Sequence, residues 1–132
     1  TRQVWAAMVG SDLVDAVMAA SPGGVSSQIE ICGAQGATLR IDCSLSLARA
    51  VAARLFDLPP EEIEHELILD AMGEIANVIG GHIKGAWPGA VRLSLPVTRE
   101  TDAGEPAPSW PVSQGFAAGD GELSVHMKSS DA

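Results

Sequence analysis

The first regular pattern of hydrophobic and polar positions lies in segments 28–32 (QIEIC) and 38–43 (TLRIDC). Both segments alternate apolar and polar residues, which is the pattern of strands that bury one face. Residues 33–37 between them are short and contain glycine, which favours a turn. We therefore predict a β-hairpin over these segments.

Two helices are predicted after this hairpin. Segment 45–56 (LSLARAVAARLF) has apolar residues at helical spacing, with Ser44 at the N-cap position. The sequence DLPP at 57–60 breaks this helix, and its prolines open a longer one from about residue 60 to residue 86. Two glutamates after the prolines suit the positive N-terminal end of a helix, and the sequence WPG ends it.

Alternating patterns predict three further strands, at residues 91–97, 112–118 and 121–128. The last two would form a hairpin about the sequence GDG. Residues 99–111 are rich in proline, glycine and charge and are expected to form a loop, with residues 129–132 as a tail.

The N-terminal part of the sequence is less regular. Residues 1–9 fit the end of an amphipathic helix, and residues 12–19 fit a strand or a helix. The chain begins at Thr1 and not at Met, so we expect that residues once preceded it. Its length suits one domain over residues 1–132. The order of elements predicts a two-layer α+β fold, in which the long amphipathic helix and one or two further helices pack on a mainly antiparallel sheet.

The long helix has one apolar and one polar side, because successive residues advance by about 100°. The hydrophobic residues on the apolar side would pack on the sheet: Leu69, Met72, Ile75, Ile79 and Ile83. The other side carries a polar stripe within a sector of roughly 80°. The polar stripe consists of Asp70, Glu74, Asn77, Gly81 and Lys84.

A polar stripe on an amphipathic helix is normally its solvated side. Two features favour a functional role here. The stripe carries the short residues Asn77 and Gly81 where long charged side chains are usual. Asn and Gly also form helices less readily than Ala or Lys. Gly73, Gly80 and Gly81 also keep the helix surface low, so that the backbone of another protein could approach.

The chemistry available to Glu74 and Asn77 suits the hydrolysis of an acyl phosphate. Such a reaction depends on the position of the attacking water and on charge stabilisation. A carboxamide both accepts and donates hydrogen bonds, so it can hold that water in line. A carboxylate one helical turn away can bind a cation on the partner.

Composition narrows the classes of partner. The net charge is −9, with 17 acidic and 8 basic residues, which argues against nucleic acid and against anionic membrane surfaces. No apolar run reaches the ~18–20 residues of a membrane span. We expect a cytoplasmic protein, in which a reducing compartment keeps cysteines as thiols. Cys32 and Cys43 lie at opposite ends of the predicted hairpin and are expected to be free thiols.

Other sites are not supported by the sequence. His65, His82 and His126 are scattered and lack the spacing of zinc ligands. No glycine-rich phosphate loop, calcium loop or nucleophile elbow is present. The three tryptophans are interpreted as packing or loop anchors: Trp5, Trp87 and Trp110.

Segment 67–85 (LILDAMGEIANVIGGHIKG) resembles the signature of the CheC/CheX/FliY phosphatase family. That signature is an acidic or Ser residue, three residues, Glu, two residues and Asn, followed by small residues. It matches at Asp70, Glu74 and Asn77. The order of the neighbouring elements also follows the CheX-like layout, so the resemblance covers roughly residues 25–98. One motif favours the CheX-like branch, because CheC-like members usually carry two.

The resemblance implies a phosphatase that acts on CheY-type response regulators. Glu74 would contact the active-site lysine of the receiver domain, and Asn77 would orient water beside its aspartyl-phosphate. Asp70, Gly81 and Lys84 would be partner-binding residues. The chain would need no cofactor or metal of its own, because the receiver domain would hold the Mg²⁺. A homodimer is also expected from the resemblance.

A second hypothesis assigns the same surface to binding without catalysis. The helix would then dock on a receiver domain, or on a chemotaxis or flagellar-motor component, as a non-catalytic binding module or scaffold. Only a measurement of phosphate turnover separates this hypothesis from the first.

Overall fold

The computed structural model describes residues 14–16, 24–102, 105, 108–118 and 121–129 of the chain. The helix expected in residues 1–9 lies outside the described residues. Of the ambiguous segment 12–19, residues 14–16 are described, and they form a strand.

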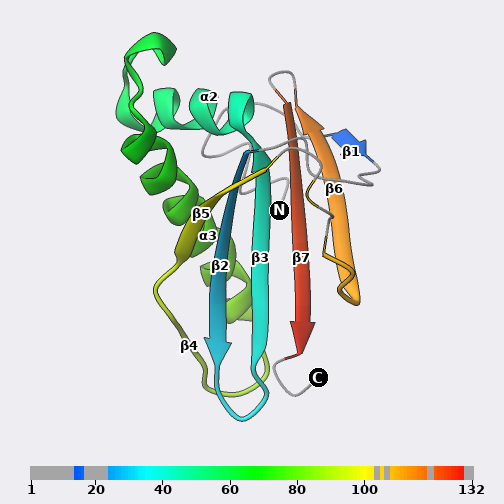
Figure 1. Ribbon diagram of the computed structural model, residues 1–132. Coiled ribbons are helices and arrows are strands. Elements are labelled where there is room, and N and C mark those ends of the chain that lie inside the picture. Colours follow the sequence, from blue (N-terminus) through cyan, green and yellow to red (C-terminus); the bar gives the residue numbers. More distant parts are fainter. Residues whose placement is uncertain (1–13, 17–23, 103–104, 106–107, 119–120, 130–132) are drawn as a thin grey trace.

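The described strands pair into one sheet in which every pairing is antiparallel. The strands are β1 (Val14–Ala16), β2 (Gly24–Cys32), β3 (Ala37–Ser44), β4 (Arg92–Leu93), β5 (Val97–Thr101), β6 (Val112–Ala118) and β7 (Gly121–Ser129). Their order is β1-β6-β7-β3-β2-β4, and β5 also pairs with β2. With the helices behind it, this sheet confirms the predicted α+β fold (Figure 1).

Both predicted hairpins are confirmed. In the first, Ile31 of β2 pairs with Ala37 of β3 next to the turn, and Val25 pairs with Cys43 at the far end. The second hairpin joins β6 to β7, and its last strand extends to Ser129, one residue into the predicted tail.

The first hairpin keeps the two cysteines apart, and both are free thiols. Cys32 is half-buried, whereas Cys43 is buried. Burial raises the pKa of the Cys43 thiol, and the nearby Asp42 charge raises it further. We therefore expect a thiol reagent to label Cys32 in the folded protein and to leave Cys43 unlabelled.

Mass spectrometry after labelling measures this difference. The Cys32→Ser variant isolates the second thiol, which should react only after denaturant is added. Rapid labelling of Cys43 in the folded variant would contradict the burial of its thiol.

Three helical segments follow the first hairpin: α2 (Leu45–Phe56), the 3-10 helix η1 (Pro60–Glu62) and α3 (His65–Ala86). The helix α2 has the predicted bounds. Ser44 has the extended backbone of an N-cap, but its side chain does not cap the helix. Its Oγ instead accepts a hydrogen bond of 3.1 Å from the backbone N–H of Glu122, which ties the start of α2 to β7.

The predicted start of the long helix at residue 60 is wrong, because the chain is extended at residues 63 and 64 before α3 begins. The side chain of Ile63 is buried in the core, which requires this break. Arg49 of α2 donates hydrogen bonds to the backbone oxygens of Ile63 at 2.8 Å and Pro60 at 3.4 Å. The bond to Ile63 satisfies a carbonyl group that the break leaves outside a helix.

The helices cover one face of the sheet, and the main core lies between the two layers (Figure 1). Alternate residues of the central strands point into this core, including Ile29, Leu39 and Ile41. The opposite face, which we call the second face, carries the polar residues of the same strands.

The predicted strand at 91–97 is wrong as one continuous strand, because β4 and β5 are separate. Ile31 pairs with Leu93 and Gln28 pairs with Val97, so two residues of β2 lie opposite three residues, 94–96. This is a β-bulge. Pro96 has no N–H to donate, which favours the interruption at this point.

The strand β5 extends to Thr101. The predicted start of the loop at residue 99 is therefore wrong, and the loop begins after Thr101. Thr98 lies 2.9 Å from Ser27 through their side-chain oxygens, which fixes β5 against β2 on the helix side of the sheet.

Candidate functional site on helix α3

The polar stripe of α3 faces solvent along its whole length. All five of its residues are exposed. On the other side of the helix, Met72, Ile75 and Ile79 are buried in the core, while Leu69 and Ile83 are partly buried against it. The helical spacing therefore predicted both faces of α3.

Contacts at both ends hold α3 in place. At its start, Nδ1 of His65 lies 3.2 Å from Oε1 of Glu100 on β5. Beyond its end, Nε1–H of Trp87 donates a 2.6 Å hydrogen bond to the backbone oxygen of Gln35 in the first hairpin turn. Trp87 is thus the loop anchor that the sequence predicted.

Glu74 and Asn77 occupy neighbouring turns at the middle of the stripe. Residues three apart on a helix place their Cβ atoms about 5–6 Å apart on one side, so both groups can reach one small target. Within the described part of the chain, no hydrogen bond or ion pair engages either side chain. Both are therefore available to a partner.

The prediction that three glycines of α3 let a partner's backbone approach is correct for only one of them. A Cβ at Gly81 would meet nothing within 4 Å, so the surface there is open. Gly73 and Gly80 are buried, and a Cβ at these positions would lie 3.4 Å from Pro96 and 3.3 Å from Leu93, respectively. These two glycines allow the chain's own edge strand to pack closely, and they are not open to a partner.

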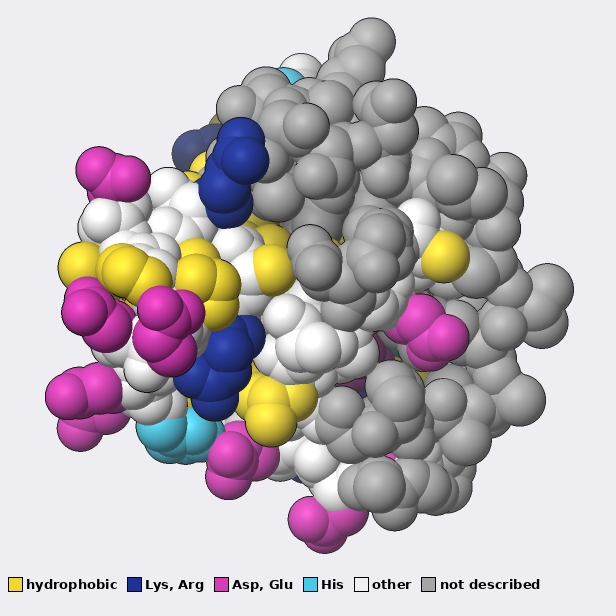
Figure 2. All heavy atoms as spheres, turned by 90° about the horizontal axis from the view of Figure 1, so that it is seen from above, with side chains coloured by type: hydrophobic (Ala, Val, Ile, Leu, Met, Phe, Trp, Pro, Cys, Tyr) yellow, Lys and Arg dark blue, Asp and Glu magenta, His cyan; other side chains and the backbone are white. Residues whose placement is uncertain are grey.

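Negative charge gathers at the end of the molecule where α3 begins. Figure 2 looks onto this end, and acidic side chains cluster on the left of the view with few basic ones among them. The exposed acidic residues here are Asp57, Glu61, Glu62, Glu64 and Glu66. The stripe continues this negative region through Asp70 and Glu74, so a cationic group on a partner would be attracted to its first half.

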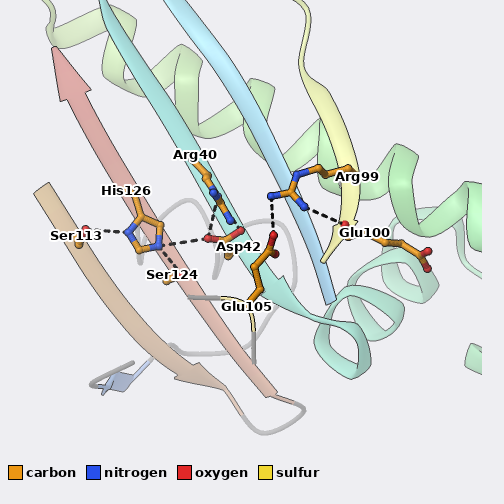
Figure 3. A network of polar contacts seen from close by, with 8 residues as sticks. All are labelled: Arg40, Asp42, Arg99, Glu100, Glu105, Ser113, Ser124 and His126. Atoms are coloured by element: carbon orange, nitrogen blue, oxygen red, sulfur yellow. Dashed lines mark hydrogen bonds and ion pairs between the residues drawn. The ribbon is translucent and has the colours of Figure 1, made fainter. Parts of the chain in front are cut away.

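A buried polar network on the second face of the sheet was not predicted from the sequence (Figure 3). Nδ1 of His126 lies 2.8 Å from Oγ of Ser113, and its Nε2 lies 2.8 Å from Oγ of Ser124 and 3.4 Å from Oδ2 of Asp42. Nε of Arg40 donates to both carboxylate oxygens of Asp42 at 3.1 Å. His126, Asp42 and Ser124 are all buried.

Burial alone would raise the pKa of Asp42, but its partners outweigh this effect. A hydrogen bond from His126, the charge of Arg40 and hydrogen bonds from Ser26 and Arg40 leave the pKa below its ordinary value. The network therefore holds Asp42 as a carboxylate and stabilises the second face. Its members could have been grouped from the sequence, because they occupy the polar positions of paired strands, but nothing in the sequence showed that they are buried.

A hollow of about 220 Å³ also lies on the second face. It is lined by Ser26, Gln28, Glu30, Arg40, Ser94, Val97 and Arg99. Its two guanidinium groups are already paired, Arg40 with Asp42 and Arg99 with Glu105 at 3.3 Å. The hollow is therefore a poor candidate for an anion site.

The other candidate residues do not form a site among the described residues. Among the described residues, no group of three His, Cys, Asp or Glu side chains is placed to bind a metal ion. The ammonium group of Lys128 lies 4.6 Å from the ring centre of Trp110, which is a cation–π contact and not a stacking platform. The part of the chain that is described contains no helix with the length and hydropathy needed to cross a membrane.

The fold and the exposed helix define an α+β domain whose candidate site is a convex helix surface suited to a protein partner. Comparison with protein families matches residues 25–108 to "Chemotaxis phosphatase CheX". The chain therefore belongs to the CheX family of chemotaxis phosphatases. A comparison with curated proteins finds no match.

Solved structures share the fold at low sequence identity. The chemotaxis protein CheX from Desulfovibrio desulfuricans is 20% identical, with a TM-score of 0.77 over 98% of this chain and 93% of that chain. CheX from Vibrio vulnificus is 18% identical, with a TM-score of 0.75 over 98% and 90%. A CheX–CheY–BeF₃–Mg²⁺ complex from Borrelia burgdorferi contains a chain that is 19% identical, with a TM-score of 0.62 over 96% and 91%.

Proposed function

We propose that this protein removes the phosphoryl group from the aspartyl-phosphate of a CheY-type receiver domain. Membership of the CheX family supports the phosphatase activity. The Borrelia burgdorferi complex, in which CheX is bound to CheY with BeF₃ and Mg²⁺, supports the receiver domain as partner. The observation that carries the proposal in this chain is the exposure of Glu74 and Asn77, which pair with no described residue, on a helix held by contacts at both ends.

In this proposal, Asn77 enters the receiver's active site and orients the attacking water. Its amide oxygen accepts a hydrogen bond from the water, and its NH₂ group donates to an oxygen of the phosphoryl group. Glu74 binds the active-site lysine of the receiver and so fixes the position of the amide one turn away. Water attacks phosphorus and gives up a proton to the solvent, and the bond from phosphorus to the aspartyl oxygen breaks. Phosphate and a free aspartate carboxylate are the products.

The outer residues of the stripe would complete the contact surface. Asp70 extends the negative region that attracts the receiver's lysine, and Gly81 leaves room for the partner's backbone. Lys84 would pair with an acidic group on the receiver. We place the Mg²⁺ on the receiver domain, which leaves this chain to supply only polar groups. Homodimer formation stays a prediction from the family resemblance.

The test of this function is the decay of phosphate on a panel of phosphorylated receiver domains from the same organism. Faster decay of at least one receiver in the presence of the protein supports the proposal and identifies the substrate. If one receiver binds but none loses phosphate faster, the phosphatase proposal is overturned. The protein would then be a binding module or scaffold.

The Glu74→Gln variant should weaken docking more than turnover. Removing the negative charge weakens the contact with the receiver's lysine, so we expect KM to rise about tenfold at low salt. The difference from the unmodified protein should shrink at high salt, because salt screens exposed charges. Steady-state kinetics at two ionic strengths measure both effects.

Glu62→Gln is the matched control, since Glu62 is an exposed carboxylate on η1, outside the stripe. It should leave KM almost unchanged. Equal effects of the two substitutions would show that Glu74 acts only through the overall negative charge.

A further inference from the structure

The edge of the sheet runs beside the turn of α3 that carries Asn77. As described above, Gly73 packs against Pro96 and Gly80 packs against Leu93. Gly73, Asn77 and Gly80 follow one another at spacings of four and three residues, so they lie along one side of the helix. Asn77 is therefore level with the residues between Leu93 and Pro96.

The two segments also match in length. The helix rises about 10 Å from residue 73 to residue 80. An extended chain rises about 3.3 Å per residue, so the three steps from residue 93 to residue 96 span at most about 10 Å. Helix and edge strand thus run alongside each other in opposite directions, and the bulge at residues 94–96 lies beside Asn77.

The bulge presents one large apolar side chain on a fixed backbone. Leu95 is 86% exposed, more than any other large hydrophobic residue in the described ranges. Its neighbour Ser94 donates its backbone N–H to the oxygen of Glu30 at 2.9 Å, and the N–H of Glu30 donates to Oγ of Ser94 at 2.9 Å. Pro96 packs against α3 on the other side of Leu95.

A single exposed leucine is ordinary on a protein surface. What distinguishes Leu95 is its place beside the candidate site, on a bulge that is bonded to β2 and packed on α3. Bulges are common next to active sites, where they redirect a side chain. An exposed apolar side chain next to a polar contact stabilises a complex when the partner buries it.

We infer that Leu95 is a docking residue for the phosphorylated receiver domain. It would contact an apolar side chain of the receiver when Asn77 approaches the phosphoryl group. This inference rests on the proposed function and extends its interface from α3 to the edge of the sheet. Because Leu95 does not reach the reacting atoms, it would set the affinity for the receiver and not the rate within the complex.

The Leu95→Ser variant tests this inference. We expect KM for the phosphorylated receiver to rise about tenfold with kcat unchanged, which is the effect of losing one buried leucine contact. Binding of the beryllofluoride-activated receiver should weaken by the same factor. Val112→Ser is the matched control, because Val112 is also an exposed apolar residue but lies on β6, away from α3.

The outcomes separate this inference from the proposed function. If the unmodified protein speeds phosphate decay and Leu95→Ser does so with the same KM, the inference is overturned and the proposed function stands. If the protein binds a receiver without turnover, the binding assay alone decides about Leu95. A variant that binds normally but loses self-association in sedimentation would assign Leu95 to a contact between copies, which also overturns the inference. If no receiver binds, both proposals fail.

Discussion

The Asn77→Ala variant is expected to lose the phosphatase activity almost completely while it still binds the receiver. Without the amide, water is no longer held in line with the phosphorus–oxygen bond, and we expect kcat to fall about 100-fold or more. The fold should be unaffected, because Asn77 is exposed and Ala forms helices more readily than Asn. Single-turnover decay of the phosphorylated receiver at saturating concentrations measures the effect.

His82→Ala is the matched control for this variant. His82 is exposed on the same helix but lies outside the polar stripe, so its loss should leave kcat unchanged. A normal rate for Asn77→Ala would remove Asn77 from the mechanism. A loss of receiver binding together with the rate would instead assign it to docking.

The Asp42→Ala variant is expected to show the largest loss of stability among the substitutions considered. It leaves Arg40 and His126 without their shared carboxylate on the second face of the sheet. Removing one member of a buried charge network costs more than the network contributes, because the remaining groups stay desolvated. We expect the free energy of unfolding at pH 7 to fall by about 2–3 kcal/mol, as measured by urea denaturation.

Asp42 also predicts how stability depends on pH. Its pKa is lower in the folded protein than the ordinary value of 3.8, so the unfolded chain binds a proton more readily. Its contribution to stability is therefore fully present above about pH 4 to 5 and is lost as the pH falls through the lowered, folded-state pKa. The stability difference between the unmodified protein and Asp42→Asn should shrink over this acidic range.

Glu122→Gln controls for the general effect of removing a carboxylate. Glu122 is exposed on β7 and should change the free energy of unfolding by less than about 0.5 kcal/mol. If Asp42→Asn keeps a constant difference from the unmodified protein down to pH 3, the lowered pKa of Asp42 is not a source of stability.

The sequence by itself determined the elements whose patterns are local. The alternation in residues 28–32 and 38–43 predicted the first hairpin, and helical spacing predicted α2 and the two faces of α3. The same spacing placed Glu74 and Asn77 together on the solvent side. These predictions succeeded because the period of a strand or a helix is read from a few neighbouring residues.

The tertiary structure decided the features that depend on residues far apart in the chain. Burial of Ile63 and the hydrogen bonds from Arg49 set where α3 begins. Close packing of the edge strand against Gly73 and Gly80 determined that these glycines face inward and that the bulge lies beside Asn77.

The second face shows most clearly that a sequence pattern does not predict burial. Period-two alternation assigns Asp42 and His126 to the face away from the core, but it does not tell whether that face meets water or is covered. In the folded chain both side chains are buried, and they are stabilised by partners from neighbouring strands. Burial and pairing depend on which strands become neighbours, and only the tertiary structure establishes that.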